Sequence, residues 1–331
     1  MNPYFGSEGV GFLYVFVKRM FQWVTGQLGA GDLASDELQF AVLALIAISC
    51  SLVGAFLVLK KMTMMANSLS HTILPGLVVA FLFCGFFSEA GPCSFVSMSA
   101  PILLFASLVT ALITTFSTQF FHRLFKLQED ASIGLVSTTM VAIGVVLVTV
   151  YTRSTHLGVE AVMGNVDALH PHDLKNAGWI ALLNFVVISS VFKELELVVF
   201  DVGFSRTQGF SEKGFNYLLM LLTSLTVIGA FRAVGILLVL SFLVGPVLFA
   251  RQWTHSLKSL IIVAIGTGVV ASFLSVWVSR HCLSAYQMPL STSGIASTLL
   301  GLIYFCSLGI KLTLQKLDRT GTLRGISIKG S

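Results

Sequence analysis

The sequence predicts an all-α fold, a polytopic bundle of about eight or nine membrane-spanning helices, and two observations support this prediction. Of the 331 residues, 55% are hydrophobic and only 11% are charged, whereas soluble globular chains contain about 25% charged residues. The sequence is also divided into long apolar runs of the length, about 17–25 residues, that an α-helix needs to cross a bilayer.

The apolar runs are predicted to be helices rather than strands, because an open strand in lipid leaves its backbone groups without hydrogen bonds. Barrel strands also alternate in polarity over about 10 residues, and these runs are longer and continuous. The sixth and seventh runs share one polar break around Arg232, which indicates either a tight hairpin or a broken helix. The runs are residues 38–59, 68–87, 98–120, 131–151, 176–192, 215–231, 234–250, 259–279 and 291–310.

Three segments follow from this pattern. Residues 1–37 contain an apolar stretch, Val10 to Val24, which Lys18 and Arg19 interrupt. This stretch is typical of an amphipathic helix on the membrane surface, with a short extra span as the alternative. Residues 38–310 form the transmembrane domain, and residues 311–331 form a basic tail.

The net charge of +5 does not indicate nucleic-acid binding, because the basic residues lie between apolar runs and at the C-terminus. Cytoplasmic loops of membrane proteins carry an excess of Lys and Arg. If the C-terminus is cytoplasmic, 14 of the 20 Lys and Arg residues lie on the inner side. The six outer residues are then Lys18, Arg19, Arg153, Lys175, Arg232 and Arg280. We therefore expect a multi-pass protein of a bacterial cytoplasmic membrane with its C-terminus inside.

A cluster of polar residues follows the first run. Asn67 and His71 are four residues apart and share one face of a helix, and imidazole is a common ligand of divalent transition metals. Polar residues within a span usually face a cavity or the interior of a bundle, and Pro75 removes a backbone hydrogen bond there. Two interpretations are open: a metal site, or a histidine bonded to a neighbouring helix beside a packing kink.

A second polar segment, residues 153–175, is predicted to be external and is rich in histidine and carboxylate side chains. It does not contain a defined ligand set such as HExxH. It is either a weak metal site or an ordinary polar loop. The candidate ligands are His156, Glu160, Asp167, His170, His172 and Asp173.

A third polar segment, residues 193–214, is amphipathic, of mixed charge and on the predicted inner side. It is either a docking element for a cytoplasmic partner or a solvated loop. The sequence contains no GxxxxGK[ST] motif, so it has no phosphate-binding loop of the Walker type. Any ATP hydrolysis is therefore expected in another subunit, and the chain itself is not expected to be an enzyme.

At these residues the sequence resembles the metal-type ABC permeases. GAFLVLKKMTMMANSLSHTILPG, from Gly54 to Gly76, resembles the family segment GxFLVLRRMxLxGDAxSHAVLPG, and KELELVVFDVGFSRTQGF resembles KELxLxxFDPEFAxxxGx. Four further segments match in the same order: EDASIGLVSTTMVAIGVVL, VMGNV, AVGILLVLSFLVGPVLFAR and MPLSTSGIAST. The resemblance covers almost the whole chain from about residue 38.

The resemblance implies the permease architecture of type II ABC importers, which is that of the vitamin B12 importer. It implies transport of a divalent ion, Mn²⁺, Zn²⁺ or Fe²⁺, with no permanently bound cofactor. The implied partners are cytoplasmic ABC ATPase subunits, an external metal-binding protein, a second permease subunit and membrane lipid, without nucleic acid. The implied metal residues are His71 and Asn67, and the implied residues that line or gate the pathway are Ser70, Pro75 and Gly76. The residues implied in coupling to the ATPase are Glu194, Phe200, Asp201, Phe204, Arg206 and Gly209.

The sequence departs from the family at one ligand position, where Asn67 replaces the Asp of the GDAxSH motif. The neutral amide removes a negative charge and a strong oxygen ligand. We therefore expect this permease to pair with a different permease that retains the Asp, although a homodimer is the alternative.

The sequence distinguishes two alternative functions from an ATP-driven importer. An ion-coupled secondary transporter usually carries ionisable residues deep in its spans, and this chain has almost no carboxylates there. A membrane hydrolase requires a cluster of catalytic polar residues at one interface, and only residues 153–175 offer one.

Overall fold

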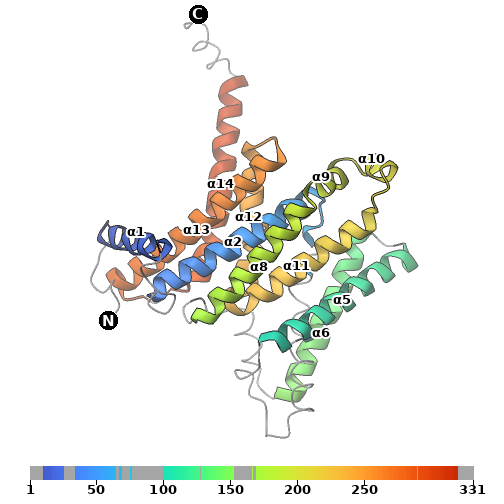
Figure 1. The fold of residues 1–331 in the computed structure, drawn as a ribbon, viewed down its shortest axis with the longest axis horizontal. Helices are drawn as coiled ribbons and strands as arrows, with labels where there is room; N and C mark the ends of the chain where they lie inside the picture. Colours follow the sequence, from blue (N-terminus) through green and yellow to red (C-terminus); the bar gives the residue numbers. More distant parts are fainter. Residues whose placement is uncertain are drawn as a thin grey trace, which may run out of the picture.

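In the computed structural model of the chain, the described part consists of helices (Figure 1). The described residues are 10–25, 34–64, 67–68, 75–76, 100–126, 128–152, 166, 169–288 and 290–319, and they contain no β-strand. The helices are α1 (Val10–Val24), α2 (Ser35–Leu59), α5 (Ala100–Phe125), α6 (Glu129–Thr152), α8 (Pro171–Ser190), α9 (Phe192–Phe200), α10 (Val202–Thr207), α11 (Glu212–Val234), α12 (Ile236–Trp253), α13 (Leu257–Tyr286) and α14 (Thr292–Arg319).

The predicted helices are confirmed wherever the structure describes them. Every apolar run except residues 68–87, most of which lie outside the described residues, corresponds to a helix. Within the described part, five helices are long and apolar enough to cross a membrane, namely α2, α11, α12, α13 and α14. The observed fold is therefore the all-α bundle that the composition predicts.

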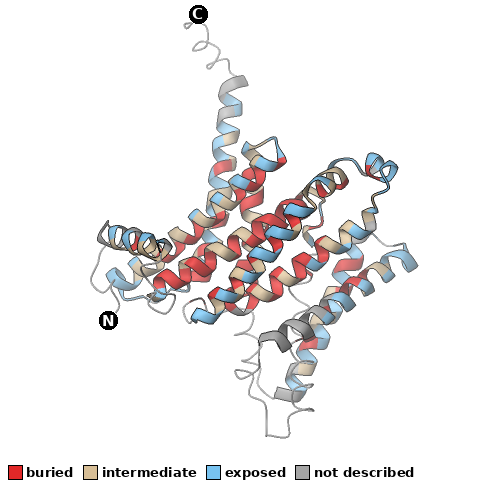
Figure 2. Ribbon diagram, viewed as in Figure 1, coloured by how far each residue is buried: buried red, intermediate tan, exposed pale blue. Residues whose placement is uncertain are grey.

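Helix α2 lies at the centre of the bundle, in contact with α8, α11, α12 and α13. Buried residues follow it along most of its length (Figure 2), and the side chains of Leu43 and Phe56 are fully buried. A helix that is apolar on all faces is typically surrounded by other helices. At Gly54, α2 lies so close to α12 that a Cβ atom would overlap the Leu243 carbonyl oxygen.

Contacts between the helices show which helix ends lie together at each end of the bundle. Ser51 of α2 donates a hydrogen bond to the Ala264 carbonyl of α13 (3.5 Å), and Phe40 packs against Phe273, so α2 and α13 are antiparallel. Since α12 ends shortly before α13 begins, its C-terminal end lies beside that of α2. Helices α9 and α10 lie at this same end (Figure 1). We refer to it as the α9–α10 end and to the opposite end as the α1 end.

A buried asparagine joins three helices in the middle of the bundle. The Asn184 Nδ2 atom of α8 donates to Ser49 Oγ of α2 (2.5 Å) and to Thr226 Oγ1 of α11 (2.7 Å). Asn184 is fully buried, and its Oδ1 atom has no hydrogen-bond partner. Hydrogen bonds of this kind between helices stabilise membrane bundles, so this triad fixes the register of α2, α8 and α11.

The N-terminal helix α1 packs across the α1 end. Arg19 forms an ion pair with Glu37 of α2 (Nε to Oε1, 2.5 Å), and the Phe16 ring packs edge-on against Phe40 and Phe273. The Glu37 side chain is fully buried, and a buried charge needs such a partner. Residues 10–24 are therefore a helix anchored to the bundle, and their position on the membrane surface stays a prediction.

The structure gives the bounds of α11, α12 and α14 in more detail than the apolar runs do. The break between the sixth and seventh runs lies at Gly235, with φ +82°, and Arg232 lies within α11. Helix α14 continues past residue 310 to Arg319. At residue 311 it lies beside the end of α12, where Lys311 Nζ donates to the Gln252 carbonyl (2.7 Å). The 310/311 boundary is thus not a helix end.

Candidate functional site

The segment between α8 and α11 forms two short helices held against the bundle. Helix α8 ends at Val191, whose backbone leaves helical geometry (φ −114°, ψ 19°), and α9 starts at the next residue. Leu195 and Val198 are three residues apart on α9 and fully buried. The Phe192 ring packs edge-on against Phe56 of α2, with 6.0 Å between the ring centroids. The apolar face of α9 thus positions this segment at the α9–α10 end.

Helix α10 begins and ends through specific local bonds. The Asp201 Oδ1 atom accepts a hydrogen bond from the Phe204 backbone N–H (2.9 Å) and so caps the first turn of α10. At the other end, the Gly209 N–H donates to the Arg206 carbonyl and the Phe210 N–H donates to the Ser205 carbonyl. This pair of bonds is a Schellman motif, and its left-handed residue, Gly209 (φ +83°), suits a side chain without Cβ.

The outer surface of this segment combines two aromatic rings with charged groups. Phe200 is 63% exposed and Phe204 is 50% exposed. Arg206 forms an exposed ion pair with Glu212 at the start of α11 (2.9 Å), and Glu194 is half-buried on α9. Exposed apolar groups beside charges are typical of a protein-interaction surface. We call the surface formed by Phe200, Asp201, Phe204 and Arg206 the coupling surface.

The coupling surface lies beside the C-terminal end of α2, where the predicted metal cluster begins. Lys60 Nζ donates a hydrogen bond to Asn216 Oδ1 of α11. The chain leaves α2 through a left-handed residue, Lys61 (φ +60°), and the Met62 N–H donates to the Leu57 carbonyl (2.9 Å). Seven residues, 60–66, separate the end of α2 from Asn67.

The predicted metal residues are only partly described. Asn67 is exposed, and the neighbouring Ser68 is buried, with a hydroxyl group that has no hydrogen-bond partner. Pro75 and Gly76 are both buried and helical. His71 and Ser70 lie outside the described residues, so the pairing of Asn67 with His71 stays a prediction.

The histidine-rich segment that is predicted to be external provides no metal site in the part that is described. The His170 N–H donates to Asp173 Oδ2 at the start of α8 (3.0 Å), and His172 Nδ1 lies 3.1 Å from the Asn176 amide nitrogen. These residues begin a helix, with Pro171 in its first turn. Within the described ranges no three His, Cys, Asp or Glu residues are grouped for a metal ion, and His156, Glu160 and Asp167 lie outside them.

Two features were missed by reasoning from the sequence. One is the buried amide of Asn184, although an asparagine within the apolar run 176–192 is a recognisable signal of helix–helix bonding. The other is a groove between α5 and α11, lined partly by Gln119 and Arg123. The polar partner of Gln119, Tyr217, belongs to a helix far away in the sequence, so no local pattern indicates this groove.

Comparison with known proteins agrees with this arrangement. The sequence pattern described as ABC 3 transport family matches residues 36–311. A probable metal transport system membrane protein of Chlamydia trachomatis serovar D is 37% identical over 325 residues, which are 96% of this chain and 99% of that protein. A manganese transport system membrane protein of Bacillus subtilis (strain 168) is 31% identical over 278 residues, 78% of this chain and 86% of that protein.

A solved structure shares the fold. PsaBC from Streptococcus pneumoniae in complex with Fab contains a chain that matches with a TM-score of 0.70 and 21% identity. The match covers 85% of this chain and 94% of that chain. The likeness therefore supports the overall helical fold.

Proposed function

We propose that this chain, which belongs to the ABC 3 transport family, is the membrane-spanning permease subunit of an ATP-driven importer for a divalent transition-metal ion. The observation that carries the proposal is the family match across residues 36–311. The coupling surface adds a physical reason, because an ATP-driven permease needs a firm contact with the subunit that hydrolyses ATP. The relatives described as metal and manganese transport proteins support the class of cargo.

We infer that the α9–α10 end faces the cytoplasm. This end gathers basic residues from several helices, including Lys60, Arg123, Lys258 and Lys311, and cytoplasmic ends of membrane helices are enriched in such residues. In this orientation the coupling surface and the C-terminus are cytoplasmic, and α1 is external. An external metal-binding protein would then deliver the ion at the α1 end.

In the proposed mechanism, the ion passes between two permeases near Asn67 and His71. The carbonyl oxygens that Pro75 frees from helical bonding would lie beside this route. ATP binding to partner subunits acts on the coupling surface and changes the populations of inward-facing and outward-facing states. The ion is the cargo, and ATP hydrolysis takes place outside this chain.

The function is tested by reconstituting the permease with its ATPase and metal-binding protein in proteoliposomes and measuring uptake of ⁵⁴Mn²⁺. We expect accumulation that requires ATP and the binding protein, because neither step can be performed by this chain alone. Non-hydrolysable ATP analogue is the matched control. Uptake that continues without ATP would instead support an ion-coupled secondary transporter.

We expect a second, different permease in the complex, because the Asn67 side chain is neutral. A negatively charged carboxylate would attract a divalent ion more strongly. A partner that carries an Asp at the equivalent position would restore one carboxylate to the shared site. We therefore expect an affinity-tagged form of this chain, purified from its native membrane, to retain a second permease of different mass. A complex in which mass spectrometry detects this chain as the sole permease would contradict the heterodimer and leave the transport function standing.

A further inference from the structure

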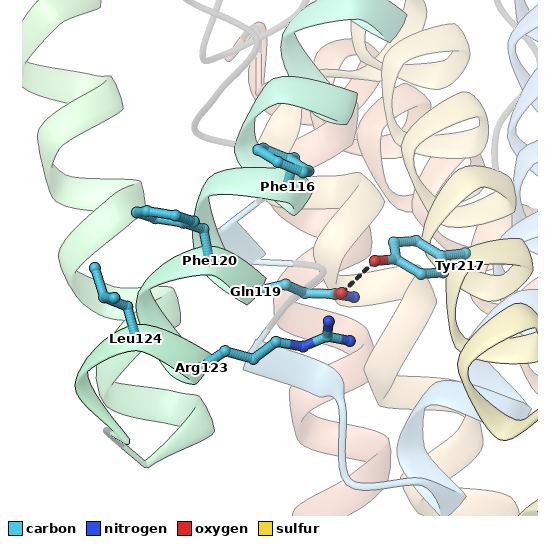
Figure 3. A pocket seen from close by; sticks show the side chains of 6 residues that line it. All are labelled: Phe116, Gln119, Phe120, Arg123, Leu124 and Tyr217. Atoms are coloured by element: carbon cyan, nitrogen blue, oxygen red, sulfur yellow. Dashed lines mark hydrogen bonds between the residues drawn. The ribbon is translucent and has the colours of Figure 1, made fainter.

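A groove of about 380 Å³ lies on the surface between α5 and α11, near the α9–α10 end (Figure 3). Five of its residues lie within the last ten residues of α5, and the sixth belongs to α11. Its volume is in the range of small-molecule sites in proteins, about 300–1,000 Å³. The lining residues are Phe116, Gln119, Phe120, Arg123, Leu124 and Tyr217.

The groove has one polar edge and one apolar edge. Gln119 and Arg123 point toward Tyr217, and the Tyr217 hydroxyl donates a hydrogen bond to Gln119 Oε1 (Figure 3). Phe120 and Leu124 point to the other side of α5 (Figure 3). Both are more than half exposed. The groove therefore offers a cation and an amide N–H along one edge, and an unfilled apolar strip along the other.

Polarity also changes along the length of the groove. Phe116 lies two turns before Arg123, or about 10 Å along the helix axis, and Arg123 lies in the last turn of α5. Among the residues that the structure describes, no carboxylate lies within ion-pair distance of Arg123. Its charge therefore remains available, at the depth where a spanning helix leaves the hydrocarbon for the headgroup region.

We propose that this groove binds a membrane phospholipid with an anionic headgroup. The headgroup phosphate accepts hydrogen bonds from the Arg123 guanidinium and from the Gln119 side-chain amide, which the Tyr217 hydroxyl orients by bonding to Gln119 Oε1, and an acyl chain lies against Phe116 and Phe120. Arginine forms paired hydrogen bonds with phosphate, and the cytoplasmic leaflet is rich in anionic lipids. The proposal rests on the membrane-spanning fold and on the inferred inner position of the α9–α10 end, and it is independent of the ion that is transported.

The test is native mass spectrometry of the full-length chain, released from micelles that contain phosphatidylglycerol and phosphatidylcholine with identical acyl chains. We expect wild-type protein to retain phosphatidylglycerol preferentially. Arg123→Gln should lower that preference about ten-fold, as for the loss of a hydrogen bond between two charged groups. Lys126→Gln is the matched control, because it removes the same charge three residues away, outside the groove.

Two further measurements distinguish lipid binding in this groove from non-specific lipid binding and from binding of a free phosphate. Tyr217→Phe should also reduce the preference for phosphatidylglycerol, and it keeps the ring, so it tests the site even if Arg123→Gln is poorly folded. Glycerol phosphate at millimolar concentration should not displace the lipid. Equal loss in Lys126→Gln, equal retention of the two lipids by wild type, or displacement by glycerol phosphate would each overturn the proposal. A groove that a second permease covers, with no lipid retained in the assembled complex, would overturn it as well.

Discussion

Replacing Gly54 by alanine is expected to prevent the permease from accumulating as a folded protein. The added Cβ atom would overlap the carbonyl oxygen of Leu243 and lie 3.0 Å from its carbonyl carbon. Both are backbone atoms of α12, so no side-chain rotation relieves the overlap, and α2 and α12 must separate. Overpacking of a well-packed core typically costs about 1–3 kcal/mol, and here it affects the central helix. The measurement is the yield of monodisperse protein and its thermal-unfolding midpoint in detergent.

The matched control is Gly266→Ala on α13, where an added Cβ meets no atom within 4 Å. Alanine is a better helix former than glycine by roughly 0.5–1 kcal/mol, so this variant should be as stable as wild type or slightly more stable. Equal midpoints for Gly54→Ala and Gly266→Ala would show that the close approach of α2 to α12 is unimportant. The same pair of substitutions thus separates packing from helix propensity.

The double variant Phe200→Ala, Phe204→Ala is expected to abolish ATP-driven uptake while the permease stays folded. Both rings are at least half exposed, so their loss leaves no cavity in this chain. Aromatic residues at the centre of an interface often contribute 2 kcal/mol or more each, which is about thirty-fold in affinity for one ring. Two measurements check this: co-purification of the ATPase and ⁵⁴Mn²⁺ uptake in proteoliposomes.

Phe21→Ala is the control for the coupling variant. Phe21 is 68% exposed and lies on α1, at the opposite end of the bundle. It should therefore retain the ATPase at wild-type affinity. Normal ATPase binding and normal uptake in the double variant would contradict the assignment of the coupling surface, whereas the family membership would be unaffected.

The long helices could be predicted from the sequence because each depends mainly on local composition. An apolar run of 17 residues or more has few alternatives to a spanning helix, and α13 and α14 begin within two residues of the predicted starts at 259 and 291. Their ends were less predictable. Helix α14 continues to Arg319, and this extension includes a contact between residues far apart in the sequence, from Lys311 to the Gln252 carbonyl at the end of α12.

Helices α9 and α10 were not predicted as helices, since segments of 9 and 6 residues are too short to be stable alone. Leu195 and Val198 are fully buried, and α9 is held by contacts with α2 and α11, which lie far away in the sequence. The coupling residues were identified from the family motif, and the structure adds physical roles for two of them, because Asp201 caps α10 and Gly209 ends it. The role of Asn184 depends on partners from two other helices.

The single residue between α11 and α12 has a mechanical consequence. Gly235 alone connects them, and its backbone (φ +82°, ψ 161°) has a geometry that residues with a side chain rarely adopt. A one-residue connection cannot extend, so the C-terminal end of α11 cannot move without moving the first turn of α12. A displacement of α10 by an ATPase partner would act on α11 at its N-cap residue, Ser211. Because α11 is joined directly to α12, the displacement would also move α12, the helix that contacts Gly54.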